Sequence, residues 1–266
     1  MNPITFTYKY GKSKALTMSY DDGHVEDRRL VEIFDKYGIR GSFHLNSGFL
    51  GKDSYIEESE VKELYKNHEV SCHTLTHPRL ERISPMDVTY EILSDKENLE
   101  RACGYVVRGM SYPFGTYNKE VIELLRSLGM RYSRTTRSTG DIRSIPEDFM
   151  LWDPTCHHSD KNLLLYFDRL MSIQMSLPLL YVWGHSYEFE RNNNWELIEE
   201  FCQKAGGHED VWYATNIELY DYITAVSKCE MSADRTVLYN PSAVSVWVKA
   251  NGNIIECKGG ENTVLG

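Results

Sequence analysis

The sequence predicts an α/β protein in which helices connect the strands of a parallel sheet. Short apolar runs alternate along the chain with segments of helical spacing, which is the pattern of repeated βα units. Polar clusters follow directly after several of these runs, and α/β barrels and open α/β sheets place their sites at that end of their strands. The 266 residues suit one large domain, or one domain with a small appendage.

The first predicted elements lead to a pair of adjacent carboxylates. An edge strand or hairpin arm covers residues 4–10, and a strand at 15–19 delivers Asp21 and Asp22 at its end. Residues 25–37 have helical spacing and close at Gly38, a typical C-cap residue. The next predicted elements are a strand at 41–45, a helix at 59–67, a strand at 69–72, a helix that begins at Ser84 and Pro85 and runs to about 102, and a strand that begins at 105–107 and ends at the turn that follows.

The second half continues this alternation before the pattern changes. The predicted elements are a turn at 112–115, a helix at 119–128, a strand at 131–134, a polar loop at 135–149, a helix at 162–174, a strand at 179–183, a helix at 195–205, a strand at 211–214 and a helix at 216–226. From residue 236 onward, short apolar runs flank an Asn251-Gly252 turn, which indicates a small antiparallel β appendage. We therefore expect an α/β domain at 1–228 and a β appendage at 229–266 packed on it.

Composition restricts the partners. The formal net charge of −10 argues against nucleic acid or an anionic membrane, and an uncharged or weakly charged substrate fits better. The six cysteines form no Cys-x-x-Cys pair, so we expect reduced, buried thiols. The chain shows neither a leader-like start nor an apolar run of membrane-spanning length. As given, it is expected to be soluble and cytoplasmic, although a secreted chain trimmed of its leader would look the same.

Two polar clusters carry residues that bind metals. Asp21 and Asp22 repel each other when buried, and a cation would offset that repulsion. His73 and His77 are four residues apart, close enough to share one ion. Asp22, His73 and His77 would provide three ligands and leave an open position, the usual arrangement of catalytic zinc, while Asp21 would be free to act as a base. The alternatives are a simple turn at Asp-Asp-Gly and two unrelated polar histidines.

These clusters resemble a known family. Ser19-Tyr20-Asp21-Asp22-Gly23, followed about fifty residues later by His73-Thr74-Leu75-Thr76-His77, resembles the first two motifs of the NodB-homology, or polysaccharide deacetylase, family, and the resemblance runs from about residue 15 to 213. It implies a distorted (β/α)7 barrel. It also implies that Asp22, His73 and His77 bind Zn²⁺, with Co²⁺ or Ni²⁺ also compatible with such ligands, and that Asp21 is the general base.

The third motif of that family is only partly matched. Ser111-Tyr112-Pro113-Phe114-Gly115 is similar to the end of the family's Arg-Pro-Pro-Tyr motif, which implies that the Phe114 amide stabilises the oxyanion and that Tyr112 lies beside the substrate. The motif's arginine falls on Ser111. Arg108, three residues earlier, is a candidate to reach Asp21 instead, and a surface ion pair is the alternative for it.

The later motifs imply the proton donor. Val182-Trp183-Gly184-His185 is similar to the fifth motif, so His185 is the implied general acid. Trp183, with Tyr187 and Phe189, could form an apolar wall for an acetyl group or sugar ring, and core packing is equally compatible. The fourth motif, which orients the histidine, is poorly matched, with Trp152-Asp153 as its counterpart. His157 and His158 are more simply ordinary loop histidines, with substrate or metal contact as the alternative.

The sequence thus predicts a metal-dependent hydrolase that removes N-acetyl or other N-acyl groups from an amino sugar or polysaccharide. Two alternatives stay open. One is hydrolysis of an amide or imide in a small molecule by the same fold. The other is a non-catalytic carbohydrate-binding domain, which the incomplete third and fourth motifs allow.

Overall fold

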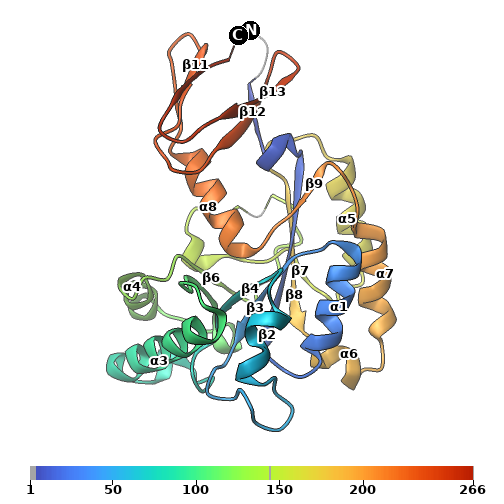
Figure 1. Cartoon of the computed structure of the whole chain (residues 1–266), viewed down its shortest axis with the longest axis vertical. Helices are drawn as coiled ribbons and strands as arrows, with labels where there is room; N and C mark the ends of the chain where they lie inside the picture. The colour runs from blue at the N-terminus through green and yellow to red at the C-terminus, as the bar shows by residue number, and fades with distance from the viewer. Residues whose placement is uncertain (1–3, 144, 266) are drawn as a thin grey trace.

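A curled parallel sheet forms the centre of the molecule (Figure 1). The computed structural model describes residues 4–143 and 145–265. Seven strands follow one another, and β9 pairs with β2 beside them, which confirms the predicted distorted barrel. Their spatial order is β6 (Tyr132–Arg134), β5 (Gly109–Ser111), β4 (Glu69–Cys72), β3 (Gly41–Leu45), β2 (Lys14–Asp22), β8 (Leu179–His185) and β7 (Cys156–His157), with β9 at Val211–Tyr213.

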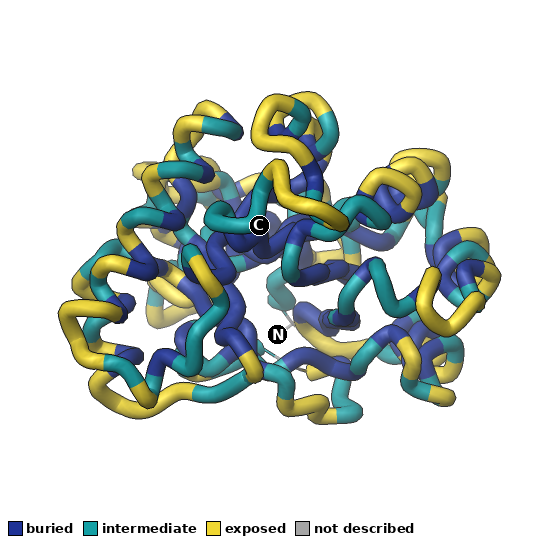
Figure 2. The backbone as a smooth tube through the Cα atoms, turned by 90° about the horizontal axis from the view of Figure 1, so that it is seen from below, coloured by how far each residue is buried: buried dark blue, intermediate teal, exposed yellow. Residues whose placement is uncertain are grey.

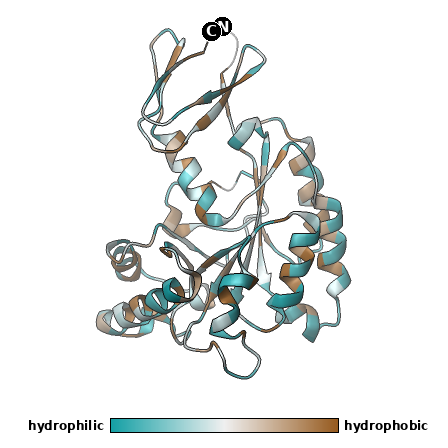
Figure 3. Ribbon diagram, in the orientation of Figure 1, coloured by the Kyte–Doolittle hydropathy of each residue, from teal (hydrophilic) through white to brown (hydrophobic). Residues whose placement is uncertain are grey.

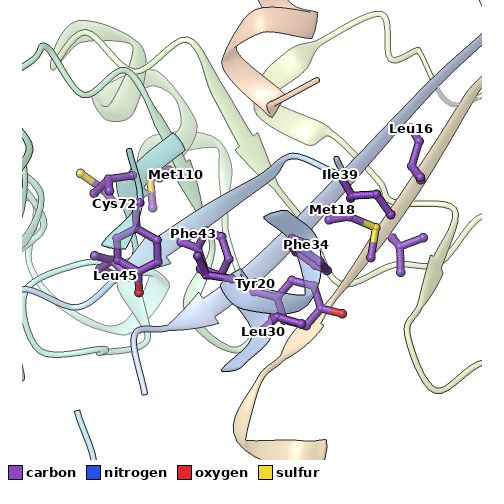
Figure 4. Packing of buried hydrophobic residues seen from close by; sticks show 14 of the residues in the cluster. Leu16, Met18, Tyr20, Leu30, Phe34, Ile39, Phe43, Leu45, Cys72 and Met110 are labelled. Carbon is purple, nitrogen blue, oxygen red and sulfur yellow. The ribbon is translucent and has the colours of Figure 1, made fainter. Parts of the chain in front are cut away.

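Strand β2 is paired along both edges. Residues 15–21 pair with β8 on one edge, while residues 14–16 pair with β9 and 18–22 with β3 on the other. Leu16, Met18 and Tyr20 belong to the same buried cluster as Leu30 and Phe34 of α1 (Asp27–Tyr37) (Figure 4). A parallel strand buried in this way needs a nearly continuous apolar run, and this run ends where the strand reaches the two aspartates.

Helices lie on both sides of the sheet, and local signals set their ends. At the start of α3 (Pro85–Cys103), the Ser84 side chain accepts a hydrogen bond from the Asp87 amide, and Gly104 with φ +85° ends the helix. The outer helices mix hydrophilic and hydrophobic residues (Figure 3), and the buried residues gather toward the interior (Figure 2). The others are α2 (Val61–Leu64), α4 (Lys119–Ser127), α5 (Leu163–Ser172), α6 (Tyr187–Arg191), α7 (Trp195–Ala205) and α8 (Asn216–Ser227).

The largest differences from the predicted elements lie at residues 59–67 and 105–107. The strand predicted to begin at 105–107 begins later, because β5 starts only at Gly109, and Tyr105 and Val106 are 44% and 67% exposed. After α3 ends, the chain crosses the surface before it enters the sheet. The predicted helix at 59–67 is shorter, since a 3₁₀ turn at Glu58–Glu60 precedes α2 and the helix ends at Leu64.

Two small antiparallel sheets form the predicted β appendage, with α8 between them and the large sheet (Figure 1). One consists of β1 (Thr5–Thr7), β12 (Val246–Ala250) and β13 (Asn253–Cys257), and the other of β10 (Glu230–Met231), β11 (Val237–Tyr239) and β14 (Asn262–Val264). Asn251 and Gly252, with φ of +51° and +80°, connect β12 to β13. Because β1 pairs with β12, the start of the chain joins this region, and the boundary at residue 228 stays a prediction. The predicted domains include residues 1–3, 144 and 266, which lie outside the described residues.

Within the described residues, none of the helices combines the length and the apolar character needed to cross a bilayer. The six cysteines are free thiols, with Cys229 half-buried and the others buried.

Candidate metal centre

The candidate site lies at the carboxyl ends of the parallel strands. Strand β2 carries Asp21 and Asp22 at its end, and His73 directly follows β4. Three further strands end on the side chains that surround them, namely Ser111 of β5, Arg134 of β6 and His185 of β8. Parallel strands deliver residues distant in sequence to one edge of the sheet, which is where α/β folds place their sites.

The backbone turns sharply after β2. Asp22 has φ +81° and Gly23 has φ +77°, and the left-handed conformation is uncommon for a non-glycine residue and marks local strain. A Cβ on Gly23 would also lie 3.0 Å from Leu45 Cδ2. The turn gives the two adjacent aspartates different surroundings, since Asp22 meets His77 while Asp21 meets Arg134.

The structure brings Asp22, His73 and His77 together, and we call these three residues the Asp22 triad. Asp22 Oδ1 lies 3.6 Å from His73 Nε2 and 3.8 Å from His77 Nε2, and one potential ligand atom from each residue lies within 4.8 Å of the others. In a tetrahedral zinc site with ligand distances of about 2.0–2.2 Å, ligand atoms are separated by about 3.3–3.6 Å. The three side chains therefore fit a single divalent cation after small movements.

Hydrogen bonds orient the two histidines. His73 Nδ1 lies 2.9 Å from the Ser111 carbonyl oxygen and 2.6 Å from Ser111 Oγ, so a proton on Nδ1 would leave Nε2 free to bind a cation. The His77 amide donates to Thr74 Oγ1 at 3.0 Å, and both residues have positive φ. Burial, and then the neighbouring His73, lower the pKa of His77 to about 4. His77 is thus neutral at pH 7, as a metal ligand must be.

Asp21 is buried beside the triad and paired with Arg134. Arg134 Nη2 donates to Asp21 Oδ2, and Ser111 Oγ donates to Asp21 Oδ1 at 2.9 Å. Burial alone would raise the pKa of Asp21, but Arg134 above all, followed by His73 and His44, holds this pKa below its ordinary value. Asp21 therefore stays a carboxylate through neutral pH. His44 is fully buried, and that burial lowers its pKa to about 3.

Arg108 does not reach Asp21, contrary to the prediction. It forms two hydrogen bonds with Asp221 of α8, at 2.9 and 2.7 Å. The reason is the late start of β5, because Arg108 precedes that strand and so lies at the opposite end from Ser111. The arginine beside Asp21 is Arg134, which sequence reasoning missed. Its position at the end of the predicted strand at 131–134 was the signal that could have identified it.

His185 lies between Asp22 and a second carboxylate. His185 Nε2 is 3.9 Å from Asp22 Oδ2, and Nδ1 is 3.3 Å from Glu188 Oε1. Burial would lower the pKa of His185, but Glu188 and then Asp21 and Asp22 raise it above its ordinary value. The predicted counterpart of the fourth motif is elsewhere, since Asp153 pairs with Arg137 and Trp152 is fully buried. Sequence reasoning missed Glu188, whose signal is its position three residues after His185.

Phe114 and Tyr112 face different surroundings. Phe114 has φ +58° and is 52% exposed, and its ring centroid lies 4.5 Å from that of His77. Tyr112 is buried, and its hydroxyl donates to the Met150 carbonyl at 3.0 Å. The Tyr112 side chain therefore packs in the core and presents no surface to a substrate, contrary to the prediction.

Trp183 lies under the guanidinium of Arg134. The Arg134 Cζ is 4.5 Å from the Trp183 ring centroid, and the His157 ring lies 4.7 Å from the same tryptophan. Trp183 is half-buried, so its suggested role as an apolar wall for an acyl group stays a prediction. Phe189 is fully buried and belongs to the core.

Sequence comparison connects this site with known proteins. Residues 9–133 match the family model described as polysaccharide deacetylase. A putative polysaccharide deacetylase of Bacillus subtilis is 22% identical over 130 residues, which cover 48% of this chain and 47% of that protein. A peptidoglycan-N-acetylglucosamine deacetylase of Listeria monocytogenes is 26% identical over 114 residues, 42% of this chain and 24% of that protein. The matches thus span less than half of these relatives.

Solved structures support the fold. A putative polysaccharide deacetylase from Mycobacterium smegmatis has a TM-score of 0.63 at 15% identity, covering 85% of this chain and 96% of that one. A CE4 family pseudoenzyme from Bacillus anthracis has a TM-score of 0.51 at 18% identity, covering 78% of this chain and 64% of that one. Because one of these similar structures is of a pseudoenzyme, similarity of fold does not establish activity.

Proposed function

The chain belongs to the polysaccharide deacetylase family through residues 9–133, and on this premise we propose that it is a metal-dependent hydrolase that removes N-acetyl or other N-acyl groups from an amino sugar or polysaccharide. One observation carries the proposal. Asp22, His73 and His77 converge as a ligand set, and Asp21 stands beside them, 3.9 Å from His73 Nε2, with an arginine as its own partner.

The ligand set suits a zinc-type cation. It consists of one carboxylate and two imidazoles from segments distant in sequence, and three protein ligands are typical of catalytic zinc, with Co²⁺ and Ni²⁺ also compatible. When bound, such a cation would polarise the acyl carbonyl and make the attacking water more acidic. The positive φ of Asp22 and of His77 is local strain of the kind that is kept at functional sites.

Asp21 is the proposed general base. Its Oδ1 accepts from Ser111 and its Oδ2 from Arg134, so the carboxylate is held in place and kept ionised. A base must carry no proton before it acts, and the Arg134 pair maintains that state across neutral pH. Asp21 would take the proton of the attacking water as the carbonyl carbon becomes tetrahedral.

His185 is the proposed general acid, and the Phe114 amide the proposed oxyanion donor. Glu188 lies beside Nδ1 of His185 and raises the pKa of this histidine. The His185 ring can therefore hold a proton and give it to the leaving amine from Nε2, the ring nitrogen that faces Asp22. The Phe114 ring contacts His77, so this residue borders the triad. An amide aimed at the developing negative charge would stabilise the tetrahedral state.

The exposed Phe114 ring supports a sugar as the substrate. Its ring contacts His77, and the guanidinium carbon of Arg79 lies 4.2 Å from the ring centroid. An exposed, rigid aromatic surface beside the reacting groups suits the apolar face of a sugar ring. The family model and the names of the relatives point to the same class of substrate. We therefore propose an N-acylated carbohydrate and keep simple amides as test compounds.

The test is acetate release by an Asp21→Asn variant. Chitooligosaccharides, peptidoglycan fragments and simple acetamides are incubated with protein loaded with Zn²⁺ or Co²⁺. We expect the wild type to release acetate, and we expect Asp21→Asn to keep its metal by elemental analysis while losing nearly all turnover. Asp53→Asn, at an exposed position, is the matched control and should behave as the wild type. Unchanged turnover in Asp21→Asn would reject Asp21 as the base, and a failure of the wild type on every substrate class would reject the proposed reaction.

A further inference from the structure

A second cluster of metal-ligating side chains surrounds Glu188, which lies in the short helix α6. We define the Glu188 cluster as Glu188, His157, His158 and His185. Glu188 Oε2 lies 3.1 Å from His157 Nε2 and 3.0 Å from His158 Nε2, and Glu188 Oε1 lies 3.3 Å from His185 Nδ1. Three histidines on one carboxylate exceed what is needed to orient His185 alone.

The cluster is largely protected from solvent. The side chains of Glu188, His157 and His185 are 15%, 23% and 21% exposed, so water can enter but the groups are partly desolvated. Arg191 Nη2 lies 3.6 Å from Glu188 Oε1, and the Arg191 side chain is 62% exposed. Such an exposed ion pair is weak and can be displaced.

Two nitrogen atoms of the cluster can accept a cation. His185 Nδ1 is buried and, among the described residues, makes no hydrogen bond of acceptable geometry, although it lies 3.3 Å from Glu188 Oε1. His157 Nδ1 lies 2.8 Å from Ser159 Oγ and accepts a hydrogen bond from the Ser159 amide at 3.2 Å, so the ring proton is on Nε2, the atom facing Glu188, and an ion bound there would displace it. Binding of an ion at His157 Nε2 therefore releases a proton.

The separations match a zinc-type ion. One potential ligand atom from each of His157, His185 and Glu188 lies within 4.8 Å of the others. The carboxylate–imidazole separations of 3.1 and 3.3 Å are close to the spacing of about 3.3 Å between ligands of a tetrahedral zinc ion. They are shorter than the 3.6 and 3.8 Å separations in the Asp22 triad.

We propose that Glu188, His157 and His185 form a second site for a divalent cation such as Zn²⁺, and that occupation of this site inhibits the enzyme. Binding here is weaker than at the Asp22 triad, because the ion must displace the contacts between Glu188 and its histidines and must release protons from the cluster. The Asp22 triad has two carboxylates, Asp21 and Asp22, in or beside it, whereas the Glu188 cluster has a single carboxylate.

Inhibition follows from the ring nitrogen that the ion would occupy. A cation on His185 Nδ1 takes the position of a proton, so the imidazole keeps one proton on Nε2 and cannot become the doubly protonated acid. It would also separate His185 from the charge of Glu188. This part of the inference rests on the proposed function, because it needs His185 as the proton donor to the leaving amine, while the binding part rests on geometry alone.

Metal stoichiometry tests the binding part. The whole chain, with its thiols blocked by methylation, is dialysed against increasing Zn²⁺ and the bound metal is measured. We expect two ions per wild-type chain, one tight and one weaker. His157→Gln should lose the weaker ion, His77→Gln the tighter one, and the double variant both, while His208→Gln, a half-buried histidine outside either cluster, should keep both. A wild type that binds one ion only, or a His157→Gln variant that keeps both ions, overturns the second site.

Two further readouts test the inhibition. Excess Zn²⁺ should suppress acetate release by the wild type, and the Zn²⁺ concentration needed should rise at least tenfold in His157→Gln; equal inhibition of both proteins overturns the inhibitory role. ¹⁵N NMR of the histidine rings provides a readout that needs no substrate. The second equivalent of Zn²⁺ should shift the His185 Nδ1 signal of the wild type and not that of His157→Gln. If the wild type binds two ions and shows this shift but releases no acetate, the proposed function is rejected and the second metal site is kept. If the His185 Nδ1 signal does not move, His185 is not a ligand of the second ion.

Discussion

Replacing Arg134 by methionine isolates the charge that keeps Asp21 ionised. Arg134 and Asp21 are 0% and 3% exposed, so neither is compensated by solvent. Methionine is similar in length and can fill the space over Trp183, where the guanidinium carbon now lies 4.5 Å from the ring centroid. In the variant, Asp21 is left buried with Ser111 Oγ and the neutral His44 as neighbours.

The expected loss of stability can be worked from the protonation of Asp21. An unpaired buried carboxylate avoids its charge most readily by taking up a proton. Protonating a group with an ordinary pKa of 3.8 at pH 7 requires about 4 kcal/mol, at about 1.4 kcal/mol per pH unit. This agrees with the roughly 3–5 kcal/mol lost when one partner of a buried ion pair is removed. We therefore expect Arg134→Met to lower the free energy of unfolding by about 4 kcal/mol at pH 7.

The sign of the pH dependence follows from the same group. In the wild type the folded-state pKa of Asp21 lies below the unfolded value, so its contribution is present above about pH 4 and lost below it. In Arg134→Met the folded-state pKa is raised instead, so the penalty grows as pH rises above about 4. The stability difference between the two proteins should fall to about 2 kcal/mol at pH 5.

Urea unfolding of the metal-free proteins at pH 5 and pH 7, monitored by circular dichroism, measures both quantities. The double variant Arg134→Met/Asp21→Asn is the decisive control, because it removes the buried carboxylate together with its partner. It should regain most of the stability lost by Arg134→Met while remaining inactive. A single variant that loses less than about 1 kcal/mol at pH 7, or a double variant no more stable than the single, would refute the reasoning about this pair.

Two other predictions concern residues outside the proposed chemistry. Burial raises the pKa of Asp27 to about 7, above its unfolded value, so the folded state binds the extra proton between about pH 4 and 7 and stability falls as pH rises through that range. Asp27→Asn, which keeps an acceptor for the Tyr65 hydroxyl, should remove about 3 kcal/mol of the difference in unfolding free energy between pH 5 and pH 8, and an unchanged difference would contradict a protonated Asp27. A Cβ on Gly109 would lie 2.1 Å from Tyr132 Cε1, so Gly109→Ala should destabilise the fold by at least about 1–3 kcal/mol. Urea unfolding checks this, and wild-type stability would mean that Tyr132 has room to move.

The convergence of Asp22, His73 and His77 could be predicted because short motifs at strand ends specify it. A short apolar run identified β2, and the parallel arrangement then brings its last residues beside those that follow β4. The pattern needed no knowledge of side-chain orientation. The alternation of strands and helices predicted the curled sheet for the same reason, since local spacing sets each element and parallel pairing sets their common direction.

The assignment of Arg108 failed because the start of one strand was placed too early. The prediction began this strand at residues 105–107, which put Arg108 inside it, whereas β5 begins at Gly109. A shift of a few residues moved this arginine to the opposite end of the sheet. Glu188 was missed for a different reason. Its partners His157 and His158 come from another strand end, and a lone glutamate in a short helix carries no spacing that points to them.

The pairing of β2 also affects how the chain is made. Strand β3 is synthesised soon after β2, but β8 and β9 begin only at Leu179 and Val211. At a translation rate of about 5–20 residues per second, roughly 10–40 s pass between β2 and the last of these partners. During that interval one edge of β2, with the apolar Leu16 and Met18, has no strand beside it, and an unpaired apolar edge invites aggregation. A nascent chain of this protein is therefore expected to need a chaperone over its amino-terminal half until the ribosome has completed β9.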